Sequence, residues 1–361
     1  MASNSFFQDE HTSLLQKLVR EVVNDPSTYL GSKYLPSIAL AVRRIRTEVV
    51  QASGGLTNEH AIGTDPKYIQ STGTRVQEFE PPAYKESILY NEEKILYLRE
   101  LGQNDSSKRG IRQFIDLDVD KLNRRLEARI EYLRWQAIFG GQFTYFGKTF
   151  VYGIPAANTV VPTVLWSLDG INANASANPI QDLRFWLTGG QANYRKYKFS
   201  KIVMNPNTVR WILDNANTQA LIKTYFSAEN FGDYDVSKVL KMLLPGLPPI
   251  EVYNGWYQSE TVDATTGNVT VGDAIFFVPD GKIFFEASLP DGDKIGEFVQ
   301  GLNLGSGTID NPGFGKFLII EDNTAPGTRG GPKNTFIDIT AGVYGGPKLD
   351  RPFDVLTAAC S

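Results

Sequence analysis

The sequence contains only one cysteine and two histidines among its 361 residues. With Cys360 alone, no disulfide can form within the chain, and a reducing compartment is the expected setting. His11 and His60 lie far apart in the sequence, so the usual ligand sets for zinc are missing. A Ser-His-Asp triad is equally disfavoured, because the sequence has no G-x-S-x-G segment. We therefore expect no metal, no cofactor and no catalytic centre of these kinds.

An excess of positive charge and long apolar runs are missing too. The net charge is −4 and the isoelectric point is about 5.5, which argues against a basic nucleic-acid-binding domain. A protein that encloses nucleic acid without gripping it remains compatible with this charge. No stretch reaches 18 apolar residues, so we expect no membrane-spanning helix. The 42% hydrophobic and 21% charged residues are typical of a globular protein, long enough here for two or three packed units.

Two segments have the composition of a phosphate-binding or calcium-binding loop but lack its residue spacing. The Gly-rich segment 305–317 lacks the phosphate-loop spacing, because its Gly-Lys pair is followed by Phe317 rather than by Ser or Thr. The acidic residues Asp291, Asp293 and Glu297 lack the spacing of a calcium loop, and a solvated turn explains them. An enzyme is therefore not expected. An acid-based glycosidase stays open as an alternative, since it needs only two carboxylates.

The first expected element is an amphipathic helix over residues 11–24. Leu14, Leu18 and Val22 share one face of it, and Asp25-Pro26 ends it. A helix with a single apolar stripe requires a partner surface. We expect that surface to belong to a neighbouring molecule.

Residues 51–99 indicate a long excursion of two extended arms without a core of its own. The arms are too long for strands within a single globular unit, and Pro81-Pro82 places the second arm at an edge or in an exposed position. Arginines alternate here with glutamates, which favours an interface of mixed charge over nucleic-acid contact. The residues expected at that interface are Arg43, Arg44, Arg75, Glu78, Phe79, Tyr84 and Lys85.

The clearest helix is predicted over residues 118–139. Apolar residues recur in it at spacings of three and four, and Asp118 or Asp120 is expected to cap its start. Gly140-Gly141 ends it, and an aromatic hairpin over 142–152 follows. The face opposite the apolar stripe is expected to be charged, with Arg124, Arg125, Glu127, Glu131 and Arg134.

A second unit follows in which helices and strands alternate, and this indicates an α+β or α/β fold. One hairpin is predicted over 272–287, with Asp280-Gly281 as its turn. Helices are predicted over 179–190, 206–226 and 235–244, and strands over 198–205, 249–253, 315–322, 334–343 and 351–359.

The order of these parts resembles the major capsid proteins of tailed bacteriophages, specifically the capsid protein E family with the Hong Kong 97-type fold. The segment ARIEYLRWQAIFGGQFTYFGKTF (128–150) looks like the end of that family's long spine helix and the strand pair after it. IVMNPNTVRWILDN (202–215) looks like the strand–Pro–helix element of its axial domain. Later strands of the family look similar to IEVYNGWYQ (250–258), FFVPDGKIFFEA (276–287) and VYGGPKLDRPFDVLTAAC (343–360).

The resemblance implies an α+β fold in four parts. An N-terminal arm with an amphipathic helix would cover 1–50 and an extended loop 51–100. A peripheral domain carrying the spine helix 118–139 would combine 101–164 with 291–361. The axial domain would cover 165–290.

The resemblance also implies a function. The protein would form the icosahedral shell of a virion from pentamers and hexamers, and would enclose double-stranded DNA without sequence-specific binding. A scaffolding protein, a portal and a decoration protein would be its partners, and assembly would take place in the host cytoplasm. A covalent cross-link through Lys67, Lys85 or Lys94 is an open alternative to ordinary surface lysines. An encapsulin-type compartment is the runner-up, and a β-rich carbohydrate-active enzyme or binding protein is the third hypothesis.

Overall fold

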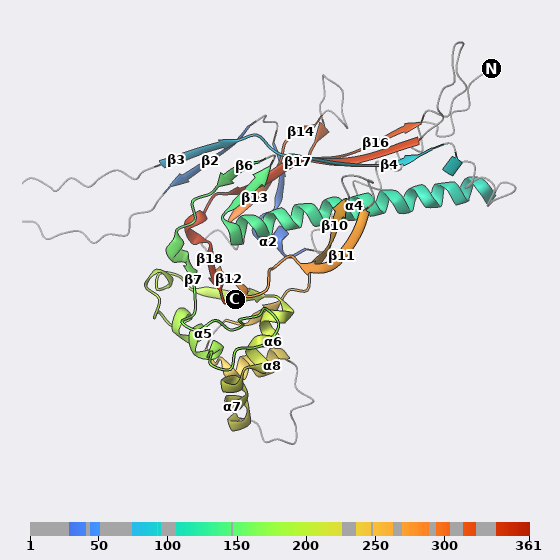
Figure 1. Ribbon diagram of the computed structural model, residues 1–361. Coiled ribbons are helices and arrows are strands. Elements are labelled where there is room, and N and C mark those ends of the chain that lie inside the picture. Colours follow the sequence, from blue (N-terminus) through green and yellow to red (C-terminus); the bar gives the residue numbers. More distant parts are fainter. Residues whose placement is uncertain are drawn as a thin grey trace, which may run out of the picture.

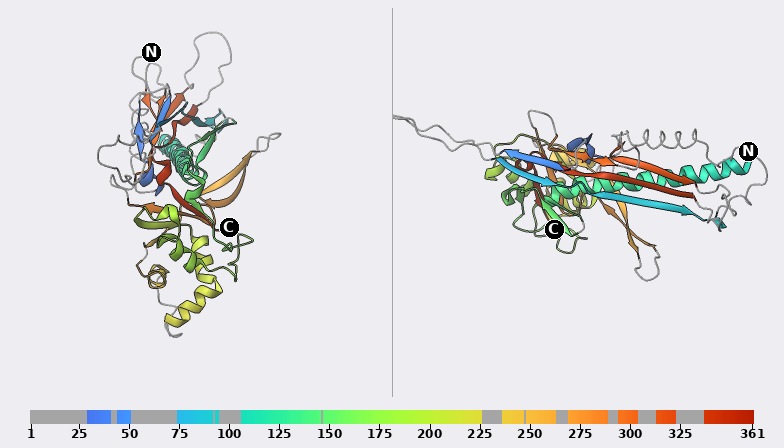
Figure 2. Two further views of the ribbon diagram at one scale, coloured as in Figure 1. Left: turned by 90° about the vertical axis from the view of Figure 1, so that its left-hand side faces the viewer. Right: turned by 90° about the horizontal axis from the view of Figure 1, so that it is seen from above.

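The computed structural model describes residues 29–40, 44–50, 74–91, 93–94, 106–145, 147–225, 236–246, 248–262, 269–288, 294–303, 313–322 and 337–361. Its fold is mixed α+β, as predicted. Figure 1 shows a long helix and strands beside it running to one side, a two-stranded ribbon to the other side, and a helical unit below. The views in Figure 2 show that the molecule is elongated.

The long helix α4 runs from Ser106 to Gly140, so its 35 residues span about 52 Å. It begins twelve residues before the predicted start at 118, and the prediction that Asp118 or Asp120 caps it is wrong. The apolar stripe continues upstream through Ile115, which is buried against the same sheet as Val119. Asp118 lies inside the helix, and its carboxylate accepts a hydrogen bond from the hydroxyl of Tyr90.

The apolar face of α4 packs on a sheet whose central strand is β17 (Ile337–Leu349). The first half of β17 pairs with β16 (Lys316–Asp322) on one side and with β4 (Ala83–Tyr90) on the other. Its second half pairs with β13 (Gly296–Gln300), and β1 (Ser37–Ala39) is parallel to β13. The strand predicted over 334–343 is therefore six residues longer at its end.

Residues 45–79 contribute a two-stranded antiparallel ribbon, formed by β2 (Ile45–Val50) and β3 (Thr74–Phe79). It points away from the body in Figure 1. Much of the predicted excursion over 51–99 lies outside the described residues, as does the predicted helix 11–24. Within the described part, β4 belongs to the sheet beside α4 rather than to a free arm.

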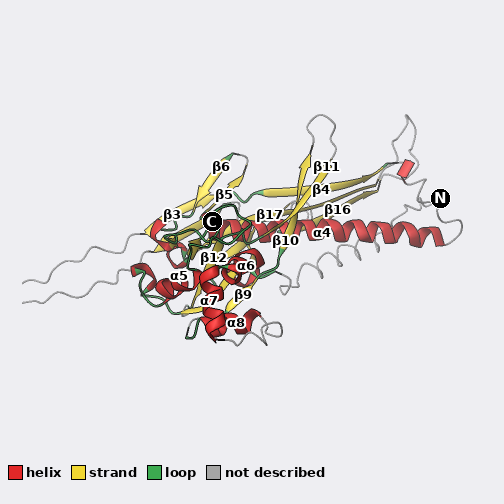
Figure 3. Ribbon diagram, turned by 60° about the horizontal axis from the view of Figure 1, so that its bottom comes forward, coloured by secondary structure: helices red, strands yellow, loops and turns green. Residues whose placement is uncertain are grey.

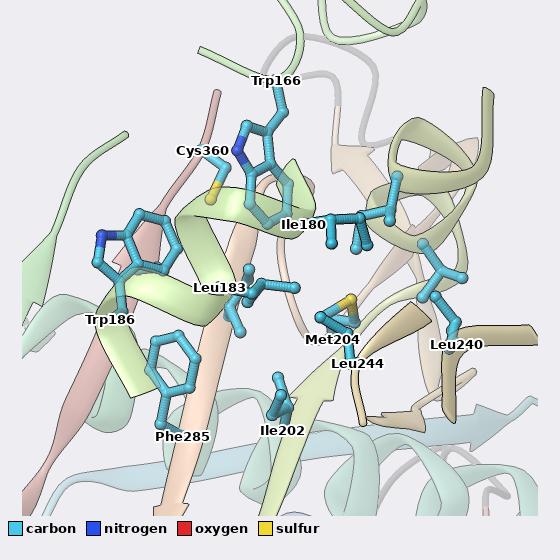
Figure 4. Close-up of a cluster of buried hydrophobic side chains, with 14 of the residues drawn as sticks. Trp166, Ile180, Leu183, Trp186, Ile202, Met204, Leu240, Leu244, Phe285 and Cys360 are labelled. Atoms are coloured by element: carbon cyan, nitrogen blue, oxygen red, sulfur yellow. The ribbon is translucent and has the colours of Figure 1, made fainter. Parts of the chain in front are cut away.

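A second five-stranded sheet shares one core with four helices. Its strands, in spatial order, are β7 (Thr159–Val160), β18 (Leu356–Ala359), β12 (Lys282–Ala287), β8 (Phe199–Met204) and β9 (Ile250–Val252). The helices are α5 (Pro179–Leu187), α6 (Pro206–Asp214), α7 (Ala216–Tyr225) and α8 (Val236–Leu243). Figure 3 shows these helices gathered beside β12 and β9. Figure 4 shows the core between these layers, with Trp166, Trp186, Met204, Phe285 and Cys360 among its buried side chains.

The hairpin predicted over 272–287 is wrong. The strand before the turn, β11 (Val269–Phe276), pairs with β10 (Trp256–Val262) in a separate ribbon. The strand after the turn, β12, pairs with β8 and β18 instead. Both strands are apolar enough for a hairpin, but β12 is covered on both faces, by the core under the helices at Ile283 and Phe285 and by the core shared with α4 at Phe284. It therefore lies inside the fold, where β8 and β18 pair with its two edges.

The helix predicted over 206–226 is interrupted at Asn215. The side-chain oxygen of Asn215 accepts hydrogen bonds from the backbone N–H groups of Asn217 and Thr218, at 2.9 and 3.2 Å. Its amide donates to the carbonyls of Asn174 and Ala177. Asn215 therefore caps α7, and the chain changes direction there.

The predicted aromatic hairpin is confirmed. Strands β5 (Gln142–Tyr145) and β6 (Lys148–Val151) pair directly after α4. Gly141 and Gly147 have φ values of 58° and 73°, which favour glycine at the helix end and in the turn. Shorter elements complete the fold: α2 (Gly31–Tyr34), β14 (Leu302–Asn303), β15 (Gly313–Phe314), and the 3-10 helices Ala156–Asn158, Ala192–Tyr194 and Pro352–Asp354.

Candidate assembly surfaces

The predicted interface residues fall into separate groups. Leu14, Leu18, Val22 and Arg43 lie outside the described residues, and so does Lys67. Arg75 lies in β3, opposite Val49 of β2. The remaining predicted residues lie on or beside the β2–β3 ribbon and on β4: Arg44, Glu78, Phe79, Tyr84 and Lys85.

The base of the β2–β3 ribbon carries charges of both signs. Arg44 Nε lies 3.7 Å from Glu80 Oε1, and both side chains are mostly exposed. Arg46 is opposite Glu78 in the ladder, and both are exposed. Because exposed ion pairs contribute at most about 1 kcal/mol, these charges add little to the fold of one subunit. They are suited to contact with another protein surface that carries both positive and negative side chains.

Two predicted interface residues have partners within the subunit. Phe79 packs on the aromatic hairpin, with its ring centroid 5.1 Å from that of Phe143 and 4.6 Å from that of Phe150. Tyr84 is half-buried, and burial is the main reason why its pKa is raised. Lys85 is exposed on β4, with its amine 5.4 Å from the ring centroids of both Phe317 and Tyr344. Lys94 Nζ lies 4.0 Å from the ring centroid of Tyr90.

A buried carboxylate holds the long helix and the N-terminal segment together. Glu131, on α4, is completely buried, and its Oε1 accepts hydrogen bonds from three groups. The donors are the Gly31 backbone N–H at 2.8 Å, the Trp135 indole at 2.7 Å and the Tyr253 hydroxyl at 2.8 Å. Burial and the charge of Glu131 together raise the pKa of Tyr253, so its hydroxyl remains a donor.

Arg134 lies beside this carboxylate and is also buried. Its Nη1 is 3.4 Å from Glu131 Oε2, and its Nη2 donates to Ser37 Oγ at 2.9 Å. Burial lowers the pKa of Arg134, and Glu131 opposes that effect. The charged face predicted for the helix is therefore not exposed along its whole length, since Glu131 and Arg134 are both buried. The signal was present, because Trp135 and Ile138 extend the apolar surface around the helix at this end, as in a helix that is covered on several sides.

A second buried carboxylate, Glu286 on β12, holds the other side of α2. It accepts hydrogen bonds from Lys33 Nζ at 2.8 Å and from the Tyr34 hydroxyl at 2.6 Å. Burial by itself raises the pKa of Glu286, but the hydrogen bonds from Lys33, Ser200 and Tyr34 outweigh it and lower that pKa. The short helix α2 is thus fixed between the long helix and the second sheet. Neither Glu286 nor Gly31 stands out in the sequence as a residue with such a role.

The described residues contain no group of three or more His, Cys, Asp or Glu side chains that is arranged to hold a metal ion. No helix among the described residues is both long and apolar enough to span a membrane. The described surfaces include the β2–β3 ribbon with its charges of both signs and a second ribbon, β10–β11, on which Trp256 and Val271 are exposed. These features suit contacts between proteins.

Comparisons with known proteins identify a family and similar structures. A family model described as phage major capsid protein E matches residues 15–316, well over half of the chain. The structure is similar to the putative capsid protein of a prophage of E. coli CFT073, with a TM-score of 0.55 and 12% identity over 97% of this chain and 99% of that one. It is also matched by a phage-related protein from Bordetella bronchiseptica RB50, with a TM-score of 0.48 and 11% identity over 96% of each chain. No protein in the curated collection matches the sequence.

Proposed function

Because this chain belongs to the phage major capsid protein E family, we propose that its copies assemble into the icosahedral shell that encloses the genome of a tailed bacteriophage. The observation that carries this function is the family match over residues 15–316. The fold shared with a prophage capsid protein along almost the whole of both chains agrees with it. The family assigns the chain a structural role and favours a phage shell over an encapsulin-type compartment or a carbohydrate-active protein.

The parts of the subunit have separate roles in this proposal. The unit of α4 with its sheet forms the peripheral domain, from 101–164 and 291–361, and the sheet with helices α5–α8 forms the axial domain within 165–290. The extended loop is narrower than 51–100, because β4 pairs with β17 and contributes to the peripheral sheet. It consists of the β2–β3 ribbon and the residues between those strands. The arm is likewise shorter than 1–50 and precedes α2, because α2 and β1 pack in the body and β2 belongs to the ribbon.

Contacts between copies are made, in this proposal, by the arm and by the ribbon. The arm contributes Leu14, Leu18 and Val22, and the charged base of the ribbon contributes Arg44 and Glu78. These copies form pentamers and hexamers, and closure by symmetry converts weak contacts into a stable shell. A scaffolding protein, a portal and a decoration protein complete the particle, which assembles in the host cytoplasm. The negative net charge suits a lumen that does not bind packaged DNA tightly.

Electron microscopy of negatively stained protein, combined with mass by light scattering, tests the proposal. The protein is expressed alone and together with its neighbouring gene products. Closed shells, or discrete pentamers and hexamers, are the expected result. A monomer under both conditions would contradict the shell function.

A charge-reversal variant tests the ribbon contact. Arg44→Glu is expected to lower the yield of shells while leaving the folded subunit intact, because Arg44 is exposed and its pair with Glu80 adds little to stability. Lys148→Glu, at an exposed position at the start of β6, is the matched control. Equal shell yields from both variants would remove Arg44 from the interface.

A further inference from the structure

The strand β3 continues into β4 through Glu80-Pro81-Pro82, and the aromatic hairpin contacts the chain on both sides of this link. Before the link, Phe79 packs against Phe143 and Phe150 of the hairpin, as described above. After the link, the backbone N–H of Ala83 donates to the Tyr145 hydroxyl at 3.1 Å. The hairpin therefore grips the residues at both ends of the link.

The link itself has little freedom to bend. Each proline fixes its own φ near −65°, and a residue that precedes a proline is restricted to extended conformations. The carbonyl of Pro82 accepts a hydrogen bond of 3.0 Å from the backbone N–H of Gly345 in β17. A rotation of the ribbon about its base is therefore opposed on β3 by the packed side chain of Phe79, and on β2 by the burial of Ile45, its partner in the ladder.

The Phe79 ring packs against two rings of the hairpin and against the backbone of β17. The two hairpin rings belong to Phe143 and Phe150, which are opposite each other in the β5–β6 ladder, with their centroids 5.6 Å apart. The backbone of β17 approaches Phe79 closely at Gly346: a Cβ at that position would lie 3.2 Å from Phe79 Cε2 and 3.0 Å from Pro82 Cδ. Tyr152 packs beside the rings of Phe143 and Phe150, and its hydroxyl donates a hydrogen bond to the carbonyl of Pro347. This bond connects the hairpin to β17.

The geometry points to a positioning role for Phe79: the β5–β6 hairpin is a clamp that sets the direction in which the β2–β3 ribbon leaves the subunit, before any second copy is bound. This inference rests on the proposed shell function, in which the ribbon meets a second copy of this chain. A preset direction lowers the conformational entropy lost on association. This positioning role would also give a reason for an aromatic hairpin directly after the long helix.

The test measures the direction of the ribbon and the rate of assembly separately. Spin labels on cysteines introduced at Glu78 and Arg124, both exposed, report the distance from the ribbon to α4 by pulsed electron paramagnetic resonance. Phe79→Ala is expected to broaden the distance distribution and to slow shell assembly at least about tenfold. Phe79→Tyr, which keeps the ring, is expected to restore both. Val76→Ala, on the same strand but with 46% of Val76 exposed, is the matched control and is expected to change neither.

An unchanged distance distribution in Phe79→Ala, or an unchanged assembly rate, would overturn the inference. If Phe79→Ala does not fold, Tyr145→Phe carries the test, because it removes only the hydroxyl that meets Ala83. A broader distribution in Tyr145→Phe would then support the clamp, and a wild-type distribution would overturn it. If the wild-type protein forms no shells, the proposed function fails, while the distance measurement on the unassembled subunit still decides the clamp.

Discussion

The hydroxyl of Tyr253 donates a hydrogen bond of 2.8 Å to Oε1 of Glu131, although the two residues are 122 positions apart in the sequence. Tyr253 follows β9 of the second sheet, and Glu131 lies in the long helix. The same oxygen accepts from the backbone of Gly31, so one buried carboxylate joins three parts of the subunit.

Replacing Glu131 with leucine is expected to reduce the free energy of unfolding by about 3–5 kcal/mol. The change leaves Arg134 buried without its carboxylate and leaves three donors without an acceptor. Urea denaturation of the unassembled subunit measures the loss. Glu78→Gln, at an exposed position on the ribbon, is the control and is expected to stay within about 0.5 kcal/mol of wild type. A Glu131→Leu protein as stable as the control would contradict the role assigned to this carboxylate.

Replacing Gly31 with alanine is expected to weaken the same connection for a steric reason. A Cβ at this position would lie 2.7 Å from Oε2 and 2.8 Å from Oε1 of Glu131. The carboxylate is held by its other donors and cannot retreat freely, so a loss of about 1–3 kcal/mol is expected. Gly140→Ala is the matched control, because the nearest atom to its added Cβ is 3.8 Å away. Equal stability of the two variants would show that Glu131 adjusts without cost.

The contribution of Lys316 to the stability of the subunit is expected to rise with pH above neutrality. Burial lowers the pKa of Lys316 from its ordinary 10.5 to about 7, although the carboxylate of Glu127 beside it favours the charged amine. Between these two pKa values the unfolded chain binds more protons than the folded one. Unfolding is therefore opposed more strongly as pH increases, by up to about 1.4 kcal/mol per pH unit.

The measurement compares wild type with Lys316→Met in denaturation series from pH 7 to 9.5. The difference in stability between the two proteins is expected to shift in favour of wild type as pH rises. Lys148→Met, at an exposed lysine, is the control and is expected to keep the wild-type dependence. A pH-independent difference between wild type and Lys316→Met would mean that Lys316 does not lose its proton in this range.

The thiol of Cys360 is expected to resist modification in the folded subunit. It is completely buried, and burial raises its pKa well above 9.0, with the charge of Asp182 adding to this effect. Since the thiolate is the reactive form, a thiol reagent should react at least about 100-fold more slowly with folded than with unfolded protein. A cysteine introduced at exposed Glu78 provides the comparison. Rapid reaction of Cys360 in folded protein would show that the core opens near the end of β18.

Much of the local structure could be predicted from the sequence. The recurrence of apolar residues at spacings of three and four identified the long helix, and Gly140-Gly141 marked where it ends. The alternating aromatic residues and Gly147 identified the hairpin. The start of the helix was predicted too late, because an aspartate such as Asp118 is a typical N-cap residue. Its actual partner is the hydroxyl of Tyr90, which is distant in the sequence.

The composition and the order of elements by themselves determined the fold class, the expectation of a structural protein and the resemblance to a capsid family, since these depend on local periodicity and on which residue types are absent. Pairings between distant segments were decided only in the tertiary structure. The separation of β11 from β12, the burial of Glu131 and the contact of Phe79 with the hairpin all depend on neighbours far away in the chain. A strand or a carboxylate carries no local mark of its distant partner, because hydrogen bonding and burial are properties of the pair.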